Sequence, residues 1–176
     1  MIEVETKYRS PGNGKVIDEL RSMGAEKISE GPMEDIYFAH PARDFGKTDE
    51  AVRIRSSDGR CELTYKGPRM ASSSAKAREE LTVAVDDGLA ARRMLERLGF
   101  REFAVIRKHR VSFVHDKLRI EVDDVEELGQ FVELELVTED PSRAEELMDH
   151  ARKGLSLTRP VPETYLEMLL EAGRKE

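Results

Sequence analysis

The sequence predicts an α+β fold in which an antiparallel β-sheet closes into a barrel, with a charged lumen and helices packed outside. The first observation is strict alternation: in Lys117–Asp123 every second residue is charged, and the residues between are apolar. The second is that the charged positions carry dense Arg and Glu, whereas strand faces in water usually carry Thr, Lys, Gln and Ser. The third is that the predicted helices have clean apolar stripes, which suit the outside of a curved sheet.

Alternation alone does not decide whether the charged face of the sheet is exposed to solvent or lines an enclosed tunnel. The commoner arrangement is an open sheet with helices on one face and water on the other. If the sheet closes, its charged face instead lines a polar tunnel, and its apolar face meets the helices. The density of charge and the helix stripes favour the tunnel over the open sheet.

Length and composition indicate one domain over residues 1–176, large enough to bury its own core. Charged residues make up 37% of the chain and the net charge is −7, which argues against nucleic-acid and anionic-membrane partners. The single cysteine, Cys61, excludes an internal disulfide framework and fits a reducing compartment. No apolar run reaches the length of a membrane span and no signal peptide is recognisable, so we expect a cytoplasmic protein.

The N-terminal residues predict a strand, a turn and a helix. Ile2–Arg9 has the strand period, which places four charged side chains on one face: Glu3, Glu5, Lys7 and Arg9. This face is either an ordinary wet surface or part of a site in which acids hold metal ions and cations hold an anion. After the turn, Asn13 caps a predicted helix that runs to about Met23, and Gly24 ends it.

The middle of the chain predicts short strands and a hairpin. Strand patterns cover residues 25–28, 34–39 and 51–56, with a loop over His40–Gly46. Ser57-Asp58-Gly59 is a turn, so that residues 60–66 pair back as a hairpin. A small, polar connection follows, and the strand pattern resumes over residues 78–85.

The remainder of the chain predicts three helices and three longer strands. One helix starts after Asp86-Asp87 and ends near Leu98, with an inward stripe of Leu89, Met94, Leu95 and Leu98. Three strands are expected over residues 103–114, 117–123 and 130–137. Two helices are expected after them, over residues 141–153 and 162–172.

A tunnel lined with acids and bases is unfavourable unless the charges are paired or bind ligands. Convergent cations predict a polyanion with several phosphates, because Arg forks match phosphate oxygens and Lys acts as a point charge. Convergent carboxylates predict Mg²⁺ or Mn²⁺ rather than zinc, and the four histidines show no zinc spacing. A metal–polyphosphate site follows, with phosphoryl or nucleotidyl transfer as its chemistry.

Short charged motifs occur in a definite order along the chain. The first is Glu3-x-Glu5-x-Lys7, and the others span nearly the whole chain: Arg53-x-Arg55, Leu63-Thr64-x-Lys66, Arg78-Glu79-Glu80, Lys108-x-Arg110, Asp123 and Leu128–Glu135. Together they resemble the motifs of the CYTH superfamily, the triphosphate tunnel metalloenzymes, whose signature is E-x-E-x-K. The segments Tyr37–Phe45, Thr48–Arg55 and Thr64–Pro68 further resemble the class IV adenylyl cyclase branch.

The resemblance implies an eight-stranded antiparallel tunnel that binds a triphosphate together with Mg²⁺ or Mn²⁺. It implies metal ligands at Glu3, Glu5, Asp123, Glu133 and Glu135. It implies substrate contacts at Lys7, Arg53, Arg55, Lys66, Arg78, Lys108 and Arg110, of which Lys7, Arg53 and Arg55 are the expected catalytic residues. Arg78 and Glu80 could instead form a structural ion pair. Tyr165 matches an aromatic residue in the C-terminal segment of the family, and its alternative role is packing of the last helix.

Three functions follow from these residues. The first is an adenylyl cyclase that converts ATP to cyclic AMP and pyrophosphate, which the class IV resemblance favours. The second is a triphosphatase that hydrolyses inorganic, thiamine or nucleoside triphosphate with the same residues. The third is a non-catalytic polyphosphate or nucleotide binder, which would need the cations but not the carboxylates. The expected partner is a small-molecule triphosphate, with ATP first, and the sequence leaves open a monomer or a homodimer.

Overall fold

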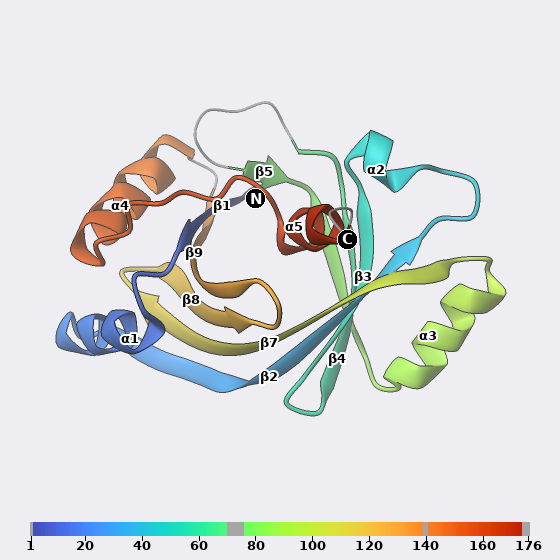
Figure 1. The fold of residues 1–176 in the computed structure, drawn as a ribbon, viewed down its shortest axis with the longest axis horizontal. Coiled ribbons are helices and arrows are strands. Elements are labelled where there is room, and N and C mark those ends of the chain that lie inside the picture. The colour runs from blue at the N-terminus through green and yellow to red at the C-terminus, as the bar shows by residue number, and fades with distance from the viewer. Residues whose placement is uncertain (1, 70–75, 139–140, 174–176) are drawn as a thin grey trace.

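A computed structural model of the chain describes residues 2–69, 76–138 and 141–173 (Figure 1). Within these ranges the side chains of residues 2, 3, 76, 77 and 141–145 are not described. The elements follow in the order β1 (Ile2–Arg9), α1 (Asn13–Ser22), β2 (Glu26–Ala39), α2 (Phe45–Thr48), β3 (Ala51–Ser57), β4 (Arg60–Lys66), β5 (Lys76–Arg78), β6 (Glu80–Val85), α3 (Gly88–Arg97), β7 (Arg101–His115), β8 (Leu118–Val125), β9 (Gly129–Thr138), α4 (Pro141–Gly154) and α5 (Tyr165–Ala172).

The strands form one curled sheet that returns on itself. Its strand order is β5-β1-β9-β8-β7-β2-β3-β4-β6, and every strand pairing among the described residues is antiparallel. The two outermost strands, β5 and β6, are consecutive in the chain and separated by Glu79 alone. They act as one bent strand that pairs with β1 on one side and with β4 on the other, which completes a ring of eight. The predicted eight-stranded antiparallel barrel is confirmed.

The strand β2 is longer than predicted. The sequence predicted separate strands over residues 25–28 and 34–39, but β2 runs through Pro32 without a break. Pairing with β7 begins at Glu26, whereas pairing with β3 begins only at Met33. Pro32 therefore lies where β2 is a sheet edge on the β3 side, and an edge tolerates the missing N–H of proline.

A short helix, α2, begins inside the segment that was predicted to be a loop. The Asp44 side chain accepts a hydrogen bond from the Lys47 N–H and caps the helix. The loop prediction for His40–Gly46 was therefore wrong at its end, because Phe45 and Gly46 belong to the first turn of α2.

Three helices cover the outer, apolar face of the curled sheet (Figure 1). Helices α1 and α4 pack on one part of the sheet through a cluster that includes Val16 and Leu20 from α1 and Met148 and Ala151 from α4. The strand residues of this cluster are the apolar members of the alternating pattern: Val4, Tyr8, Val111, Phe113, Leu118, Ile120, Val122, Val132, Leu134 and Leu136. The predicted arrangement of apolar face, outer helices and inward charge is confirmed.

Helix α3 buries less of its surface than predicted. Leu95 is buried against β2 and β3, and Ala91 packs beside it. Three other members of the predicted inward stripe are exposed, with exposed fractions of 67% for Leu89, 64% for Met94 and 64% for Leu98. The prediction was wrong here because one short helix rests on a curved sheet through a narrow line of contact.

This difference in burial predicts a difference in stability. Replacing Leu20, which is fully buried, by alanine is expected to lower the free energy of unfolding by about 2–5 kcal/mol. The same change at Leu89 should alter it by no more than about 0.5 kcal/mol, because Leu89 is exposed. Urea unfolding of both variants measures this, and equal losses would contradict the packing of α3.

The last helix, α5, lies within the curl of the sheet rather than on its outer face (Figure 1). It begins at Tyr165 rather than at the predicted residue 162, because Thr164 and Glu167 form a capping box there. Its inner face joins a cluster with Tyr37, Ile106 and Phe131, which belong to the inner face of the sheet. None of the described helices is long and apolar enough to cross a membrane.

Candidate active site

The curled sheet encloses a cavity of about 820 Å³. Its charged lining comes from β1, β2, β3, β4, β7, β8 and β9 and from the bent strand, and includes Glu5, Lys7, Asp35, Arg53, Arg55, Lys66, Arg78, Glu80, Lys108, Arg110, Glu121, Glu133 and Glu135. The strand period explains this lining, because alternate residues of each strand point inward. The charged face predicted from alternation is therefore the lumen.

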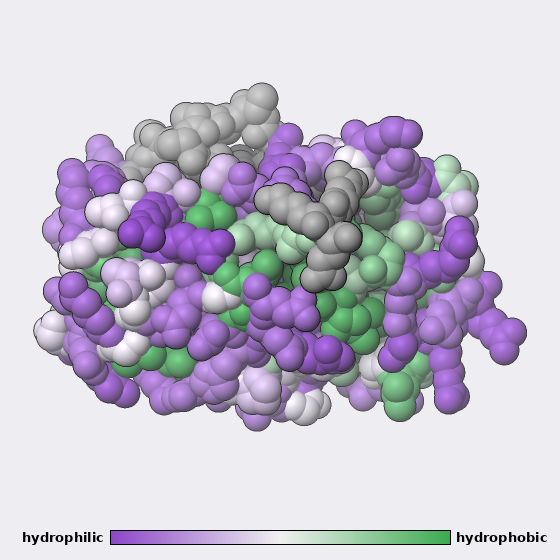
Figure 2. All heavy atoms as spheres, viewed as in Figure 1, coloured by the Kyte–Doolittle hydropathy of each residue, from purple (hydrophilic) through white to green (hydrophobic). Residues whose placement is uncertain are grey.

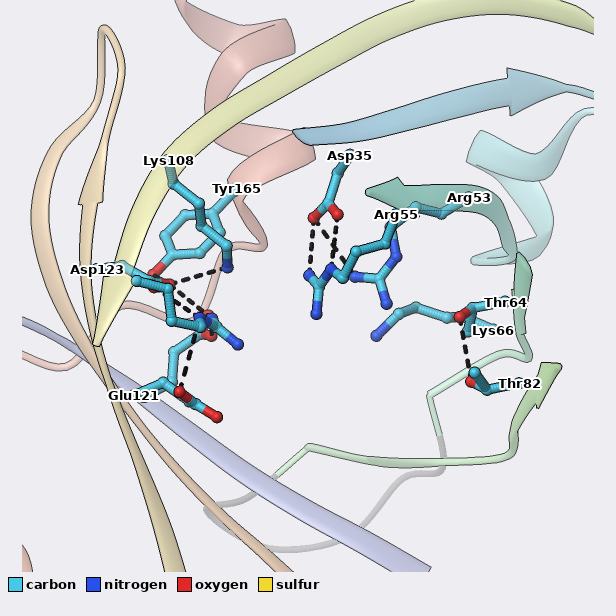
Figure 3. Close-up of polar contacts among 12 residues, drawn as sticks. Asp35, Arg53, Arg55, Thr64, Lys66, Thr82, Lys108, Glu121, Asp123 and Tyr165 are labelled. Atoms are coloured by element: carbon cyan, nitrogen blue, oxygen red, sulfur yellow. Dashed lines mark hydrogen bonds and ion pairs between the residues drawn. The ribbon is translucent and has the colours of Figure 1, made fainter. Parts of the chain in front are cut away.

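The side chains of the lumen form two groups that face each other across the cavity (Figure 3). One group, the arginine wall, comprises Asp35, Arg53, Arg55, Lys66 and Arg78 from β2, β3, β4 and β5. The other, the carboxylate wall, comprises Glu5, Lys7, Lys108, Arg110, Glu121, Asp123, Glu133 and Glu135 from β1, β7, β8 and β9. Each wall is held together by its own ion pairs.

In the arginine wall, Asp35 holds two arginines side by side. Arg55 donates from Nε to Asp35 Oδ1 at 2.7 Å and from Nη2 to Oδ2 at 2.8 Å. Arg53 lies 3.5 Å from Oδ2 of the same carboxylate. Burial would raise the pKa of Asp35, but the charges of Arg53 and Arg55 outweigh it and hold that pKa well below its usual value.

Lys66 belongs to the same wall. Its Nζ lies 2.6 Å from Glu80 Oε1, and Arg78 Nε lies 3.5 Å from the same oxygen. Arg78 and Glu80 thus form an ion pair, which was one of the two roles expected for them. Burial and the nearby charge of Arg53 lower the pKa of Lys66. The cations are crowded enough to disfavour one another, and a bound anion would relieve that repulsion.

In the carboxylate wall, Asp123 is fully buried and accepts from three side chains. Lys108 Nζ donates to Oδ2 at 2.9 Å, and Arg110 donates to Oδ1 at 2.7 Å and to Oδ2 at 2.6 Å. The Tyr165 hydroxyl donates to Oδ2 at 3.0 Å. Asp123 and Arg110 are direct partners across β7 and β8, which explains the pairing. In this state Asp123 orients two cations and leaves little of its carboxylate open to a metal ion.

The next carboxylates of this wall are shared with the same cations. Glu133 accepts from Arg110 Nη2 at 2.6 Å and lies 3.9 Å from Lys7 Nζ. Glu121 accepts from the Ser112 hydroxyl and lies 3.8 Å from Arg110 Nε and 2.6 Å from Arg119 Nε. The network therefore runs along the wall from β7 through β8 and β9 to β1.

Glu5 and Glu135 complete the wall, and no ion pair joins either to another residue that the structure describes. They are direct partners across β1 and β9. Burial, together with the nearby carboxylates of Glu133, Glu5 and Glu121, raises the pKa of Glu135 to about 8, although Arg110 acts against it. Two facing carboxylates that no described residue engages in an ion pair are a donor set that suits a hard divalent cation.

Most predicted site residues meet in this cavity. The predicted substrate contacts all line it: Lys7, Arg53, Arg55, Lys66, Arg78, Lys108 and Arg110. Of the predicted metal ligands, Glu5, Glu133 and Glu135 line it, and Asp123 lies within its wall. Glu3 lies on β1 opposite Arg78, but its side chain is outside the described residues. Among the described residues, no group of three or more potential ligands is already gathered at metal-binding spacing.

Sequence reasoning missed the roles of two residues. Asp35 lies in the strand β2 directly opposite Arg55, so its side chain belongs to the inward face of the sheet. The alternation of the strand could have indicated this from the sequence. Tyr165 was expected to pack, and it does, but its ring also lies 4.1 Å from Lys7 Nζ and 5.0 Å from Lys108 Nζ. Arg9, on the same strand face as Lys7, donates from Nη1 to the Leu128 carbonyl at 2.7 Å.

The fold and the cavity together define a class: a small antiparallel barrel whose charged interior carries a cationic and an acidic wall. The family model of the CYTH domain matches residues 1–165. The chain therefore belongs to the CYTH domain family, and the predicted family is confirmed.

Named relatives agree with this membership. A Methanocaldococcus jannaschii protein, named as a candidate adenylate cyclase, is 38% identical over 173 residues, which cover 96% of this chain and 98% of that protein. The adenylate cyclase CyaB of Aeromonas hydrophila is 30% identical over 162 residues, which cover 88% of this chain and 81% of that protein.

Solved structures agree on the fold. The PH1819 protein of Pyrococcus horikoshii superposes with a TM-score of 0.86 at 36% identity, covering 97% of this chain and 99% of that one. A more distant Hippeastrum protein, named as a candidate adenylyl cyclase and described as having a dominant triphosphatase activity, has a TM-score of 0.72 at 18% identity, covering 98% and 95% of the two chains. At that identity the likeness concerns the fold alone.

Proposed function

We propose that the chain is a metal-dependent adenylyl cyclase that converts ATP to cyclic AMP and pyrophosphate. The observation that carries the proposal is the division of one cavity into two walls, one suited to an anion and the other to a divalent cation. The arginine wall presents crowded cations suited to several phosphates. The carboxylate wall presents Glu5 and Glu135, which form no ion pair with a described residue. The adenylate cyclase names of the relatives support ATP as the triphosphate.

The carboxylate wall fits Mg²⁺ or Mn²⁺. We assign Glu5, Glu133 and Glu135 as ligands, with Glu3 on the same strand face as Glu5. Asp123 is engaged by Lys108, Arg110 and Tyr165, so it would join the ligands only after substrate phosphates take over these cations. When bound, the divalent ions would lower the pKa of the attacking hydroxyl and offset phosphate charge.

The cations of the lumen supply the remaining chemistry. In the proposed reaction the ribose 3′-oxygen forms a bond to the α-phosphorus, and the bond from that phosphorus to the bridging oxygen of pyrophosphate breaks. The 3′-hydroxyl proton passes to solvent, because we assign the described lumen carboxylates to metal ions or to ion pairs. We assign Arg53 and Arg55 to the leaving pyrophosphate and Lys7 to the reacting phosphate, and the support is that all three side chains line the cavity.

The second candidate function is hydrolysis of a triphosphate by water. It uses the same two walls, and it differs only in whether a hydroxyl of the substrate or a water molecule attacks. The dominant triphosphatase activity described for the Hippeastrum protein keeps this candidate open, although the two chains share the fold alone.

A product assay separates the two candidates. The purified protein is incubated with ATP or inorganic triphosphate, each with Mg²⁺ or Mn²⁺, and cyclic AMP, pyrophosphate and phosphate are quantified. We expect cyclic AMP and pyrophosphate in equal amounts from ATP, and no product from either substrate when a chelator is present. Phosphate release without cyclic AMP would reject the cyclase and favour the triphosphatase.

A further inference from the structure

Tyr165 is the uncharged member of the group of side chains that surround Asp123. Its hydroxyl donates to Asp123 Oδ2 at 3.0 Å, beside the donors Lys108 and Arg110 (Figure 3). Tyr165 is 7% exposed and Asp123 is fully buried, so water competes little for this hydrogen bond. A phosphate would attract the two cations, whereas a neutral hydroxyl carries no charge for it to attract. Substrate binding should therefore affect the described donors to Asp123 differently.

The ring of Tyr165 is held by packing. It meets Phe131 edge-on, with ring centroids 5.0 Å apart and ring planes at 67°, in a buried cluster that also contains residues of β2 and β7. Lys7 Nζ lies 4.1 Å from the centre of the same ring. Hydrophobic residues gather at the centre of the view in Figure 2, where Figure 1 places α5. These contacts fix the ring in the position from which its hydroxyl reaches Asp123.

The start of α5 is fixed as well. In the capping box, the Glu167 N–H donates to Thr164 Oγ1 at 3.1 Å, and the Thr164 N–H donates to Glu167 Oε2 at 2.6 Å. Arg69 donates from Nη2 to Glu167 Oε1 at 2.7 Å and from Nε to Asp49 Oδ2 at 2.8 Å, which ties the first turn of α5 to the end of α2. Because Tyr165 is the first residue of α5, these bonds also fix the direction of its side chain.

The two carboxylate oxygens of Asp123 have different partners. Oδ2 accepts from Lys108 Nζ, Arg110 Nη2 and the Tyr165 hydroxyl, whereas Oδ1 accepts from Arg110 Nε. If bound phosphates draw the two cations away, Oδ2 keeps one of its described donors and Oδ1 keeps none. The carboxylate would then stay anchored by one oxygen, while the other oxygen is open to a hard cation.

We propose that Tyr165 is a positioning residue that holds Asp123 as a conditional metal ligand, available only when the triphosphate is bound. The inference rests on the proposed function and adds a dependence between its two ligands. The triphosphate releases Asp123 from its cations, and the Tyr165 hydroxyl keeps the freed carboxylate in place. Removing a hydrogen-bond donor that orients a metal ligand typically weakens metal affinity about 10- to 100-fold. By linkage, a divalent ion held in this way strengthens triphosphate binding in return.

The change Tyr165→Phe separates this role from packing, because it keeps the ring and removes only the hydroxyl. Mn²⁺ binding is measured by equilibrium dialysis, with and without an ATP analogue that has methylene groups in place of both oxygens that bridge the phosphates. With the analogue, we expect Y165F to need about tenfold more Mn²⁺ for half-saturation than the wild type. Without it, the two proteins should bind Mn²⁺ equally, because Lys108 and Arg110 still occupy Asp123.

A double change identifies the residue through which Tyr165 acts. In the background of Asp123→Asn, the change Tyr165→Phe should cause no further loss of Mn²⁺ affinity, because the carboxylate that it positions is already gone. The matched control is Tyr65→Phe, which also removes a hydroxyl that donates to a carboxylate, that of Glu50 at 2.5 Å. It should leave Mn²⁺ binding unchanged in both conditions.

Each outcome decides the proposal. A loss confined to the analogue-bound protein supports it, and the retained Mn²⁺ binding without the analogue shows that the variant is folded. Equal losses in both conditions, or a further loss in the background of Asp123→Asn, would overturn it, because Tyr165 would then support the fold rather than Asp123. Unchanged or tighter binding by Y165F would overturn the positioning role and leave the proposed enzyme in place. A wild-type protein that binds no Mn²⁺ in either condition would overturn the proposed function, and this role with it.

Discussion

Replacing Glu5 and Glu135 together by glutamine is expected to lower metal-dependent turnover by at least about a hundredfold. Glutamine keeps the size of both side chains but removes the two carboxyl groups that face each other across β1 and β9. Without them the lumen has lost the two carboxylates that form no ion pair with a described residue, so the affinity for a divalent ion should fall sharply. The measurement is kcat as a function of Mn²⁺ concentration with ATP as substrate.

The matched control is Glu96→Gln, an isosteric change on the outside of α3, where the carboxylate lies 3.8 Å from Arg92 and half of it is exposed. It should leave both kcat and the Mn²⁺ dependence unchanged. Turnover that survived the double change at full rate would exclude this pair as metal ligands and remove the main support for a metal-dependent enzyme.

The same carboxylates make the metal-free protein sensitive to pH. The pKa of Glu135 is raised from 4.5 to about 8 by burial and by the neighbouring carboxylates of Glu133, Glu5 and Glu121. Between these pH values the folded protein holds a proton that the unfolded chain has released, so the free energy of unfolding falls as the pH rises. Glu135→Gln removes this loss. In the presence of a chelator, the stability of the variant relative to the wild type should therefore increase from pH 5 to pH 8 in urea unfolding. Parallel curves would contradict the raised pKa.

The fold was predictable because its signal repeats on every strand. Much of the barrel alternates inward charges with outward apolar residues, and helices α1 and α4 bury the matching stripe. What the alternation could not give was the length of β2, because whether the strand continues through Pro32 depends on where β3 begins to pair. The alternation also could not predict that α5 lies inside the curl of the sheet, because an apolar helix face can pack on either face of a sheet.

The membership of the site was predictable, but the partners within it were not. The alternation of inward and outward residues places both Asp123 and Glu135 at the lumen. Asp123 accepts hydrogen bonds from Lys108 and Arg110, whereas burial and nearby carboxylates raise the pKa of Glu135. The difference comes from strand register, which sets Arg110 opposite Asp123 and Glu5 opposite Glu135. Register depends on turns and bulges that lie far from these residues in the sequence, so it cannot be predicted from the pattern of a single strand.

Replacing Asp35 by alanine is expected to destabilise the ligand-free protein by about 3–5 kcal/mol, because the change leaves buried cations without their partner. The side chains of Asp35, Arg53 and Arg55 have exposed fractions of 3%, 9% and 18%. A triphosphate can replace the lost carboxylate as the countercharge. Added inorganic triphosphate with Mn²⁺ should therefore raise the melting temperature of the variant by more than that of the wild type.

Turnover should respond differently from binding. Asp35 does not reach the phosphates in this account; it fixes the direction of the two guanidinium groups. Asp35→Asn keeps the shape of the side chain and serves as the milder variant. Both changes should lower kcat while the affinity for inorganic triphosphate is kept or increased, because one competing negative charge has gone. The control Glu34→Ala breaks an exposed ion pair with Arg107 and should cost no more than about 1 kcal/mol. A loss of triphosphate affinity in the Asp35 variants would mean that Asp35 acts on the ligand directly rather than through the arginines.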